Sequence, residues 1–158
     1  MIFERRAYTM EPGYVQAFDQ AQIQRGFEPV KSYMDRLVGY FSSRTGTIDQ
    51  VVHLYRYDDF NDWNARLRAL YTVPELTSYF VNTRKIVRNQ VNGFFELLPI
   101  APLNPMWGSG NDWLPQCGIK LTGLTPAVVV EEHSFQLRPG GIPAFVEACN
   151  SSGLQALS

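Results

Sequence analysis

The order of apolar and polar side chains along residues 2–10 predicts a β-strand with Ile2, Glu4, Arg6, Tyr8 and Met10 on one face. Pro12 and Gly13 end that strand and open a helix. Apolar side chains then recur at the spacing of one helical face, at Tyr14, Ala17, Phe18 and Ala21. Gly26 and Pro29 interrupt or end this first helix.

A β-hairpin and a second helix are predicted next. Residues 37–43 and 51–57 are rich in β-branched and aromatic side chains, and residues 45–47 between them have turn chemistry. Asp58 or Asp59 can cap the helix that follows. Its apolar side chains recur at helical spacing, at Phe60, Trp63, Leu67, Leu70 and Tyr71.

A further helix start and a last strand complete the first hundred residues. Thr72 lies three residues before Glu75, the spacing of a capping box, with Pro74 in the first turn. One face of that helix continues through Leu76, Phe80 and Thr83. Residues 86–98 are predicted to form the fourth strand.

The resulting order, β-α-β-β-α-β, predicts an α+β protein of the ferredoxin-like class. Right-handed crossovers require the strand order 4-1-3-2, with strands 1 and 3 adjacent and antiparallel in the centre. Both helical segments then cover the same face of the sheet. The other face is expected to be open.

Composition limits the functions that remain. The chain has 158 residues, 45% hydrophobic and 18% charged, with a net charge of −1, so it is expected to be globular and not to bind nucleic acid. No apolar run is long enough for a membrane span. Cys117 and Cys149 have no metal or redox spacing, and the first residues form no signal peptide, so a cytoplasmic protein is expected.

The beginning of the chain is partly repeated near its end. A shift of 127 residues brings Glu4 onto Glu131, Pro12-Gly13 onto Pro139-Gly140 and Ala17-Phe18 onto Ala144-Phe145. We interpret this match as a duplication. The predicted organisation is a complete module at 1–98, a Pro/Gly-rich linker at 99–126 and a partial second module at 127–158. Residues 129–140 would restore the first strand and turn.

Several motifs, taken in order, resemble the NIPSNAP family. The opening strand matches a family pattern through Glu4, Arg6, Tyr8 and Pro12-Gly13. The segment VVHLYRYD at 51–58 resembles the family's third strand, and residues 37–41 and the Pro74-Glu75 helix start also agree. The resemblance covers residues 2–98 well and 128–148 partially.

This chain also departs from the family in two respects. Family members often have Trp where it has Tyr55 and Leu76, and its second module stops before a hairpin could form.

The resemblance implies a dimeric α+β barrel, in which two sheets pack open face to open face. A homodimer or higher homo-oligomer is therefore expected, with the partner sheet supplied by a second chain. Residues 128–145 would be a remnant or an edge extension. Eukaryotic members are associated with mitochondria, so a mitochondrial location is the alternative that the resemblance alone suggests.

The phase of the two central strands selects the candidate site. Phe3, Ala7, Val52 and Leu54 are assigned to the helix side. The open face would then carry the six candidate ligand-binding residues, Glu4, Arg6, Tyr8, His53, Tyr55 and Tyr57. Buried polar groups need partners, which can be each other, water or a ligand.

Three functions remain open. The first is binding of a small molecule in the barrel cavity, with Arg6 as the anion anchor and tyrosines as walls. The second is a cofactor-free oxygenase or isomerase with His53 as the proton acceptor and candidate catalytic residue. The third is a protein-interaction adaptor that presents Trp107 and Trp113. A plain structural network of ion pairs and hydrogen bonds would explain the same six residues. No cofactor and no metal are expected.

Overall fold

The computed structural model describes residues 1–100 and 131–153. The chain divides into two compact units: residues 1–96 belong to the first, and 97–100 with 131–153 to the second. The predicted linker, including Trp107 and Trp113, otherwise lies outside the described residues, as does Cys117.

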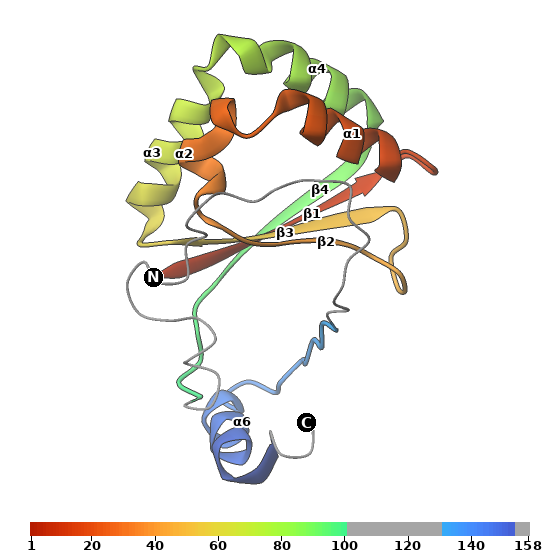
Figure 1. The fold of residues 1–158 in the computed structure, drawn as a ribbon. Coiled ribbons are helices and arrows are strands. Elements are labelled where there is room, and N and C mark those ends of the chain that lie inside the picture. The colour runs from red at the N-terminus through yellow and green to blue at the C-terminus, as the bar shows by residue number, and fades with distance from the viewer. Residues whose placement is uncertain (101–130, 154–158) are drawn as a thin grey trace. The chain divides into compact units, whose positions relative to one another are not determined.

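The first unit is a four-stranded antiparallel sheet with helices on one face (Figure 1). Its first half contains β1 (Ile2–Met10), α1 (Val15–Arg25), a 3₁₀ turn (Glu28–Val30), α2 (Lys31–Met34) and β2 (Leu37–Ser42). Its second half contains β3 (Gln50–Tyr57), α3 (Phe60–Tyr71), a 3₁₀ turn (Pro74–Leu76), α4 (Thr77–Ile86) and β4 (Val87–Phe95). The strand order is β2-β3-β1-β4, so the predicted α+β fold and its topology are confirmed.

The register of the central strands decides which side chains share a face. Arg6 of β1 lies opposite His53 of β3 and opposite Asn92 of β4. Glu4 lies opposite Tyr55 in the same way. Because directly paired residues point to the same side of a sheet, these five side chains lie on one face.

Proline has a different role near residue 29 from the predicted one. It was expected to interrupt or end the first helix, but that helix already ends at Gly26, with φ of 76°. Pro29 instead begins the helical segment that continues into α2. Proline is tolerated in a first helical turn because its missing N–H has no partner there. This start places Tyr33 and Met34 over the sheet, where both are buried.

The ends of the helices also differ from expectation. Asp59, and not Asp58, caps α3, since its side chain accepts hydrogen bonds from the N–H groups of Asn61 and Asp62. The capping box predicted at Thr72 does not form. The Thr72 hydroxyl donates to the Ala69 carbonyl and closes the end of α3. Tyr14 precedes α1 as its N-cap residue, so it is half exposed and lies outside the buried face of that helix.

The core of the first unit lies between the sheet and the helices and contains unusually many tyrosines. Its larger cluster consists of Ile2, Val30, Tyr33, Met34, Leu37, Tyr55, Tyr57, Leu70 and Leu76. The rings of Tyr33 and Tyr55 pack edge to face with centroids 5.0 Å apart. Tyrosine buries a large apolar area but brings a hydroxyl that needs a partner. The core therefore has to contain polar groups as well.

In the second unit, the repeated motif keeps its turn and helix but not its strand. Gly13 and Gly140 both have positive φ, at 83° and 78°, and α6 (Ile142–Ala148) begins 127 residues after α1. Residues 131–138, predicted to restore the first strand, are exposed and form no strand. A strand needs a neighbour for its backbone hydrogen bonds. No helix within residues 1–100 and 131–153 is long and apolar enough to cross a membrane.

Candidate ligand-binding site

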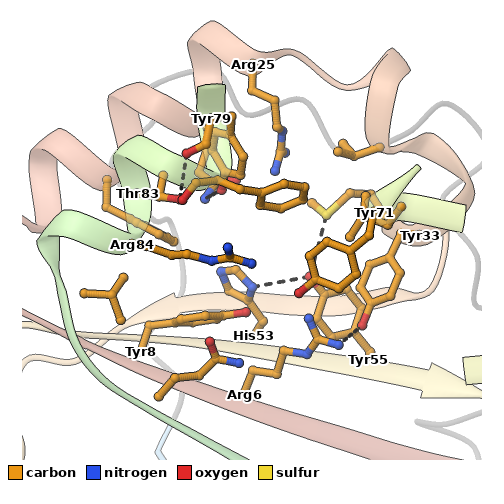
Figure 2. A pocket seen from close by; sticks show the side chains of 18 residues that line it. Arg6, Tyr8, Arg25, Tyr33, His53, Tyr55, Tyr71, Tyr79, Thr83 and Arg84 are labelled. Atoms are coloured by element: carbon orange, nitrogen blue, oxygen red, sulfur yellow. Dashed lines mark hydrogen bonds between the residues drawn. The ribbon is translucent and has the colours of Figure 1, made fainter. Parts of the chain in front are cut away.

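A cavity of about 120 Å³ lies between the sheet and the helices of the first unit. Figure 2 shows Arg6, Tyr8, His53 and Tyr55 rising from the sheet, with Arg25, Tyr79, Thr83 and Arg84 reaching down from the helices. The remaining lining residues are Phe18, Gln22, Val30, Tyr33, Met34, Leu70, Tyr71, Phe80, Val87 and Gln90. Tyr71, Arg84 and Gln90 are exposed and form its rim.

The candidate residues come together as predicted, but on the opposite face of the sheet. Glu4, Arg6, Tyr8, His53, Tyr55 and Tyr57 point toward the helices, as their contacts with Tyr33 of α2 and Phe18 of α1 show. Phe3, Ala7, Val52 and Leu54 therefore point to the helix-free side. The prediction was wrong because it treated tyrosines as polar, whereas their rings build this core. The cavity that these residues line lies inside a single module, whereas the cavity expected between two sheets stays a prediction.

The centre of the polar core is the carboxylate of Glu4, which is 0% exposed. One oxygen, Oε1, lies 2.8 Å from Arg6 Nε and accepts a hydrogen bond from Asn92 Nδ2 at 3.1 Å. The other, Oε2, accepts from the hydroxyls of Tyr33 at 3.1 Å and Tyr57 at 3.3 Å. Burial raises the pKa of both phenols, so they stay protonated and can donate. Both oxygens of this carboxylate therefore have partners.

Arg6 is fully engaged by this network. Its guanidinium pairs with Glu4, donates to the Tyr33 hydroxyl and lies over the ring of Tyr55 at 5.4 Å. The Nε–H does not point at the carboxylate oxygen, so that contact is an ion pair without a hydrogen bond. A cation that is already neutralised has little charge left for a ligand. Arg6 therefore positions the wall of the cavity and does not serve as the predicted anion anchor.

His53, like Arg6, has one side-chain nitrogen without a hydrogen-bond partner among the described residues, but no carboxylate pairs with it. The ring packs at tilted angles between the rings of Tyr40 and Tyr8, with centroids 4.4 Å and 5.1 Å away. Its Nδ1 lies 3.3 Å from the Tyr55 hydroxyl, while the buried Nε2 has no hydrogen-bond partner among the described residues. Burial, with the positive charges of Arg6 and Arg25, lowers the pKa of His53 to about 3. The imidazole is therefore neutral at pH 7.

The contacts of Tyr55 suit both tautomers of that neutral ring. When Nδ1 carries the proton, it donates to the Tyr55 hydroxyl, which in turn donates to the sulfur of Met34, 3.7 Å away. When Nε2 carries the proton, the Tyr55 hydroxyl donates to Nδ1, which is a stronger acceptor than a thioether. In both cases the buried Nε2 has no hydrogen-bond partner among the described residues.

Two lining arginines, Arg25 and Arg84, were missed by sequence reasoning. Arg25 ends α1, and Arg84 lies in the last turn of α4. Basic residues are common in the last turn of a helix, where they complement its dipole, so neither position gave a signal of function. Tyr33 was missed because its helix was not predicted. No three His, Cys, Asp or Glu side chains within 1–100 and 131–153 come together as a metal site.

Comparison with known proteins identifies the family. The NIPSNAP family model matches residues 3–102, which is more than half of the chain. The chain belongs to the NIPSNAP family. A NIPSNAP protein of unknown function from Agrobacterium tumefaciens is 28% identical, with a TM-score of 0.60, over 66% of this chain and 94% of its own. An uncharacterised NIPSNAP-like domain protein from Burkholderia xenovorans is 29% identical, with a TM-score of 0.58, over 62% and 85%.

Membership confirms the family resemblance of the strand motifs and the fold, but it names no ligand or reaction. No curated protein matches this NIPSNAP chain. The chemistry of the cavity must therefore be argued from its own side chains.

We predict that Glu4→Gln lowers the free energy of unfolding by about 3 kcal/mol, because it leaves the Arg6 charge buried without its partner. Adding Arg6→Met should recover part of that loss, so the double variant should lose about 1–3 kcal/mol less than the sum of the two single losses. Urea unfolding of the wild type, Glu4→Gln, Arg6→Met and the double variant measures the four free energies of this double-mutant cycle. Glu75→Gln, at an exposed position, is the control. Simple additivity would contradict the central role of the pair.

We also predict a specific loss of stability in acid. His53 titrates at about 3 in the folded chain against 6.5 ordinarily, so its contribution is complete above about pH 6.5 and declines as the pH falls toward 3. The free energy of unfolding of the wild type should fall by up to about 1.4 kcal/mol per pH unit through this titration. This contribution should be absent from His53→Gln. Urea unfolding from pH 7 to 4 measures it. His133→Gln, at a side chain 51% exposed, is the control and should keep the wild-type profile.

Proposed function

We propose that this NIPSNAP protein binds a small molecule in the cavity between the sheet and the helices of its first unit. The observation that carries the proposal is the buried Nε2 of His53, which has no partner within residues 1–100 and 131–153 and belongs to a side chain that lines a space of about 120 Å³. Buried polar atoms of native proteins nearly always have a partner, and each exception requires an explanation. A polar atom of a ligand would supply the missing partner.

The size of the cavity restricts that ligand. Typical sites for drug-sized ligands occupy about 300–1,000 Å³, whereas a cavity of about 150 Å³ accommodates benzene. A space of about 120 Å³ therefore suits one ring or a short chain, with a polar substituent at the exposed rim near Arg84 and Gln90. The aromatic side chains of Tyr8 and Phe18, whose ring centroids are 5.8 Å apart, suit a planar body.

The lowered pKa of His53 favours a binding function over a catalytic one. A general base works best when its pKa is near the working pH. Burial and two arginines lower the pKa of His53 to about 3, which makes it a weak base at neutral pH. The alternative of a cofactor-free oxygenase or isomerase that uses this imidazole as its proton acceptor is therefore the weaker proposal.

We further propose that two copies of the chain associate through the helix-free face of the sheet. This face carries Phe3, Ala7, Val52, Leu54, Val91 and Phe95, together with Arg5 and Arg56, and Phe3 and Ala7 are already buried within one chain. Val91 and Phe95 of β4 are 55% and 53% exposed, and only Gly93 lies between them on that side of the strand. A second sheet of the same kind would bury this apolar strip, as the family resemblance leads us to expect.

Filling the cavity should abolish binding. Thr83 is 6% exposed and lines the cavity from α4, so Thr83→Leu extends a larger side chain into it. We expect saturating benzamide, a neutral single-ring probe, to stabilise the wild type by about 2–3 kcal/mol in thermal unfolding, and Thr83→Leu to show no shift. Thr83→Val keeps the volume of the side chain, so this variant should still be stabilised by benzamide. An equal shift in Thr83→Leu, or no shift of the wild type with any single-ring probe, would contradict the proposal.

Association should depend on β4. Light scattering after size exclusion is expected to give a mass twice the 18.0 kDa of one chain. Val91→Asp should reduce it to that of one chain, because a dimer would bury the introduced carboxylate without a partner. Asn82→Asp, exposed on α4, is the control. A wild-type mass of one chain would rule out the dimer.

A further inference from the structure

The charges around the cavity are strongly unequal. Its lining residues include three arginines, Arg6, Arg25 and Arg84, and no aspartate or glutamate. Glu4, just beyond the lining, neutralises Arg6. Within the described parts of the chain, neither Arg25 nor Arg84 has a carboxylate within ion-pair distance. Two positive charges of the lining are therefore left without a counter-charge.

Both of these arginines are held in place by aromatic rings. The guanidinium of Arg25 lies over the ring of Tyr79 at 5.0 Å, and its Nε donates to the Gly26 carbonyl at 3.1 Å. Its Nη2 is buried and has no hydrogen-bond partner among the described residues. The guanidinium of Arg84 lies over Phe80 at 5.8 Å. Stacking on a ring orients a guanidinium and leaves its N–H edge available for an acceptor.

These groups converge with the unpartnered nitrogen of His53. Figure 2 shows Arg25 and Arg84 extending from α1 and α4 into the space above the imidazole. The imidazole is 5% exposed, and its Nε2 lacks a partner within the described residues. Two cations, the half-buried Arg25 and the exposed Arg84 at the rim, therefore border one small space with this nitrogen. Screening by water is weaker beside a half-buried cation than at the surface, so an anion would be attracted most strongly near Arg25.

We propose that the ligand is a small carboxylate, whose anionic group is bound by Arg25 and Arg84 and selects the tautomer of His53 that donates from Nε2. This inference rests on the proposed binding function and specifies its ligand class. Guanidinium groups match the planar geometry of a carboxylate, with two parallel hydrogen bonds. The rings of Tyr8 and Phe18 line the same cavity and would contact the ligand's planar body. Inorganic phosphate is also an anion, but it has no planar ring that could contact Tyr8 and Phe18.

Benzoate and benzamide form a matched pair of probes, because they have nearly the same shape and differ in charge at pH 7. Isothermal titration of the wild type at pH 7 should show benzoate binding at least tenfold more tightly than benzamide and than inorganic phosphate. Arg25→Gln and Arg84→Gln should each lower the affinity for benzoate about 10- to 100-fold, which is the loss expected for one charge-assisted hydrogen bond. Both variants should bind benzamide within about threefold of the wild type, which also shows that they are folded. Lys85→Gln, at the exposed position next to Arg84, should bind benzoate like the wild type.

The outcomes separate this inference from the proposal on which it rests. If benzamide binds as tightly as benzoate, or if both arginine variants keep wild-type benzoate affinity, the cavity binds a small molecule but the carboxylate assignment is wrong. Phosphate binding equal to benzoate binding would show a simple anion site and would also overturn it. If neither ring compound binds, both proposals fail together.

Discussion

The buried carboxylate of Glu4 is the constraint on which the first unit depends. A charge that is 0% exposed is tolerated only when it is paired and hydrogen-bonded. Four groups from three strands and one helix surround it: Arg6 on β1, Tyr57 on β3, Asn92 on β4 and Tyr33 on α2. They can meet only if β1 is central, β3 and β4 flank it in register and α2 lies over the sheet. The network therefore links the correct topology to the satisfaction of one charge.

That arrangement also determines which charges are available at the cavity. Arg6 lines it but is neutralised by Glu4, whereas Arg25 and Arg84 come from the ends of helices and have no carboxylate near them within the described chain. Burial, together with the positive charges of Arg6 and Arg25, lowers the pKa of His53 and keeps its imidazole neutral. The Glu4 network beneath the cavity is structural and includes Arg6. In the proposed function, Arg25 and Arg84 instead bind the ligand, so stability and recognition would use different arginines.

The two faces of the sheet have consequently opposite characters. The helix-covered face is aromatic and polar, and its hydroxyls are used for hydrogen bonds with Glu4 and His53. The helix-free face combines aliphatic and phenyl side chains with Arg5 and Arg56, and its Val91 and Phe95 are exposed. An intuitive reading of hydrophobicity inverts these faces, because it places aliphatic residues inside and hydroxyl-bearing ones outside. In this protein the large rings fill the interior, and the hydroxyls are acceptable there because each can find a partner.

The sequence by itself determined the order of the main elements and the strand order, since period, turn residues and crossover handedness are local or nearly local properties. The family was indicated by the resemblance of motif residues, such as Glu4, Arg6, Tyr8 and residues 51–58. It also grouped Glu4, Arg6, His53 and Tyr55 correctly, because alternation along a strand and pairing between neighbours are fixed by backbone geometry. Only the tertiary structure decided which side of the sheet these residues face, since both sides of β1 carry side chains that can be buried. It alone brought Arg25, Tyr33 and Arg84 to the site, because they come from helices whose rotation and packing no local pattern encodes. The strand of the repeat failed for a related reason: its sequence favours extended backbone, but a strand forms only where a neighbour completes its hydrogen bonds.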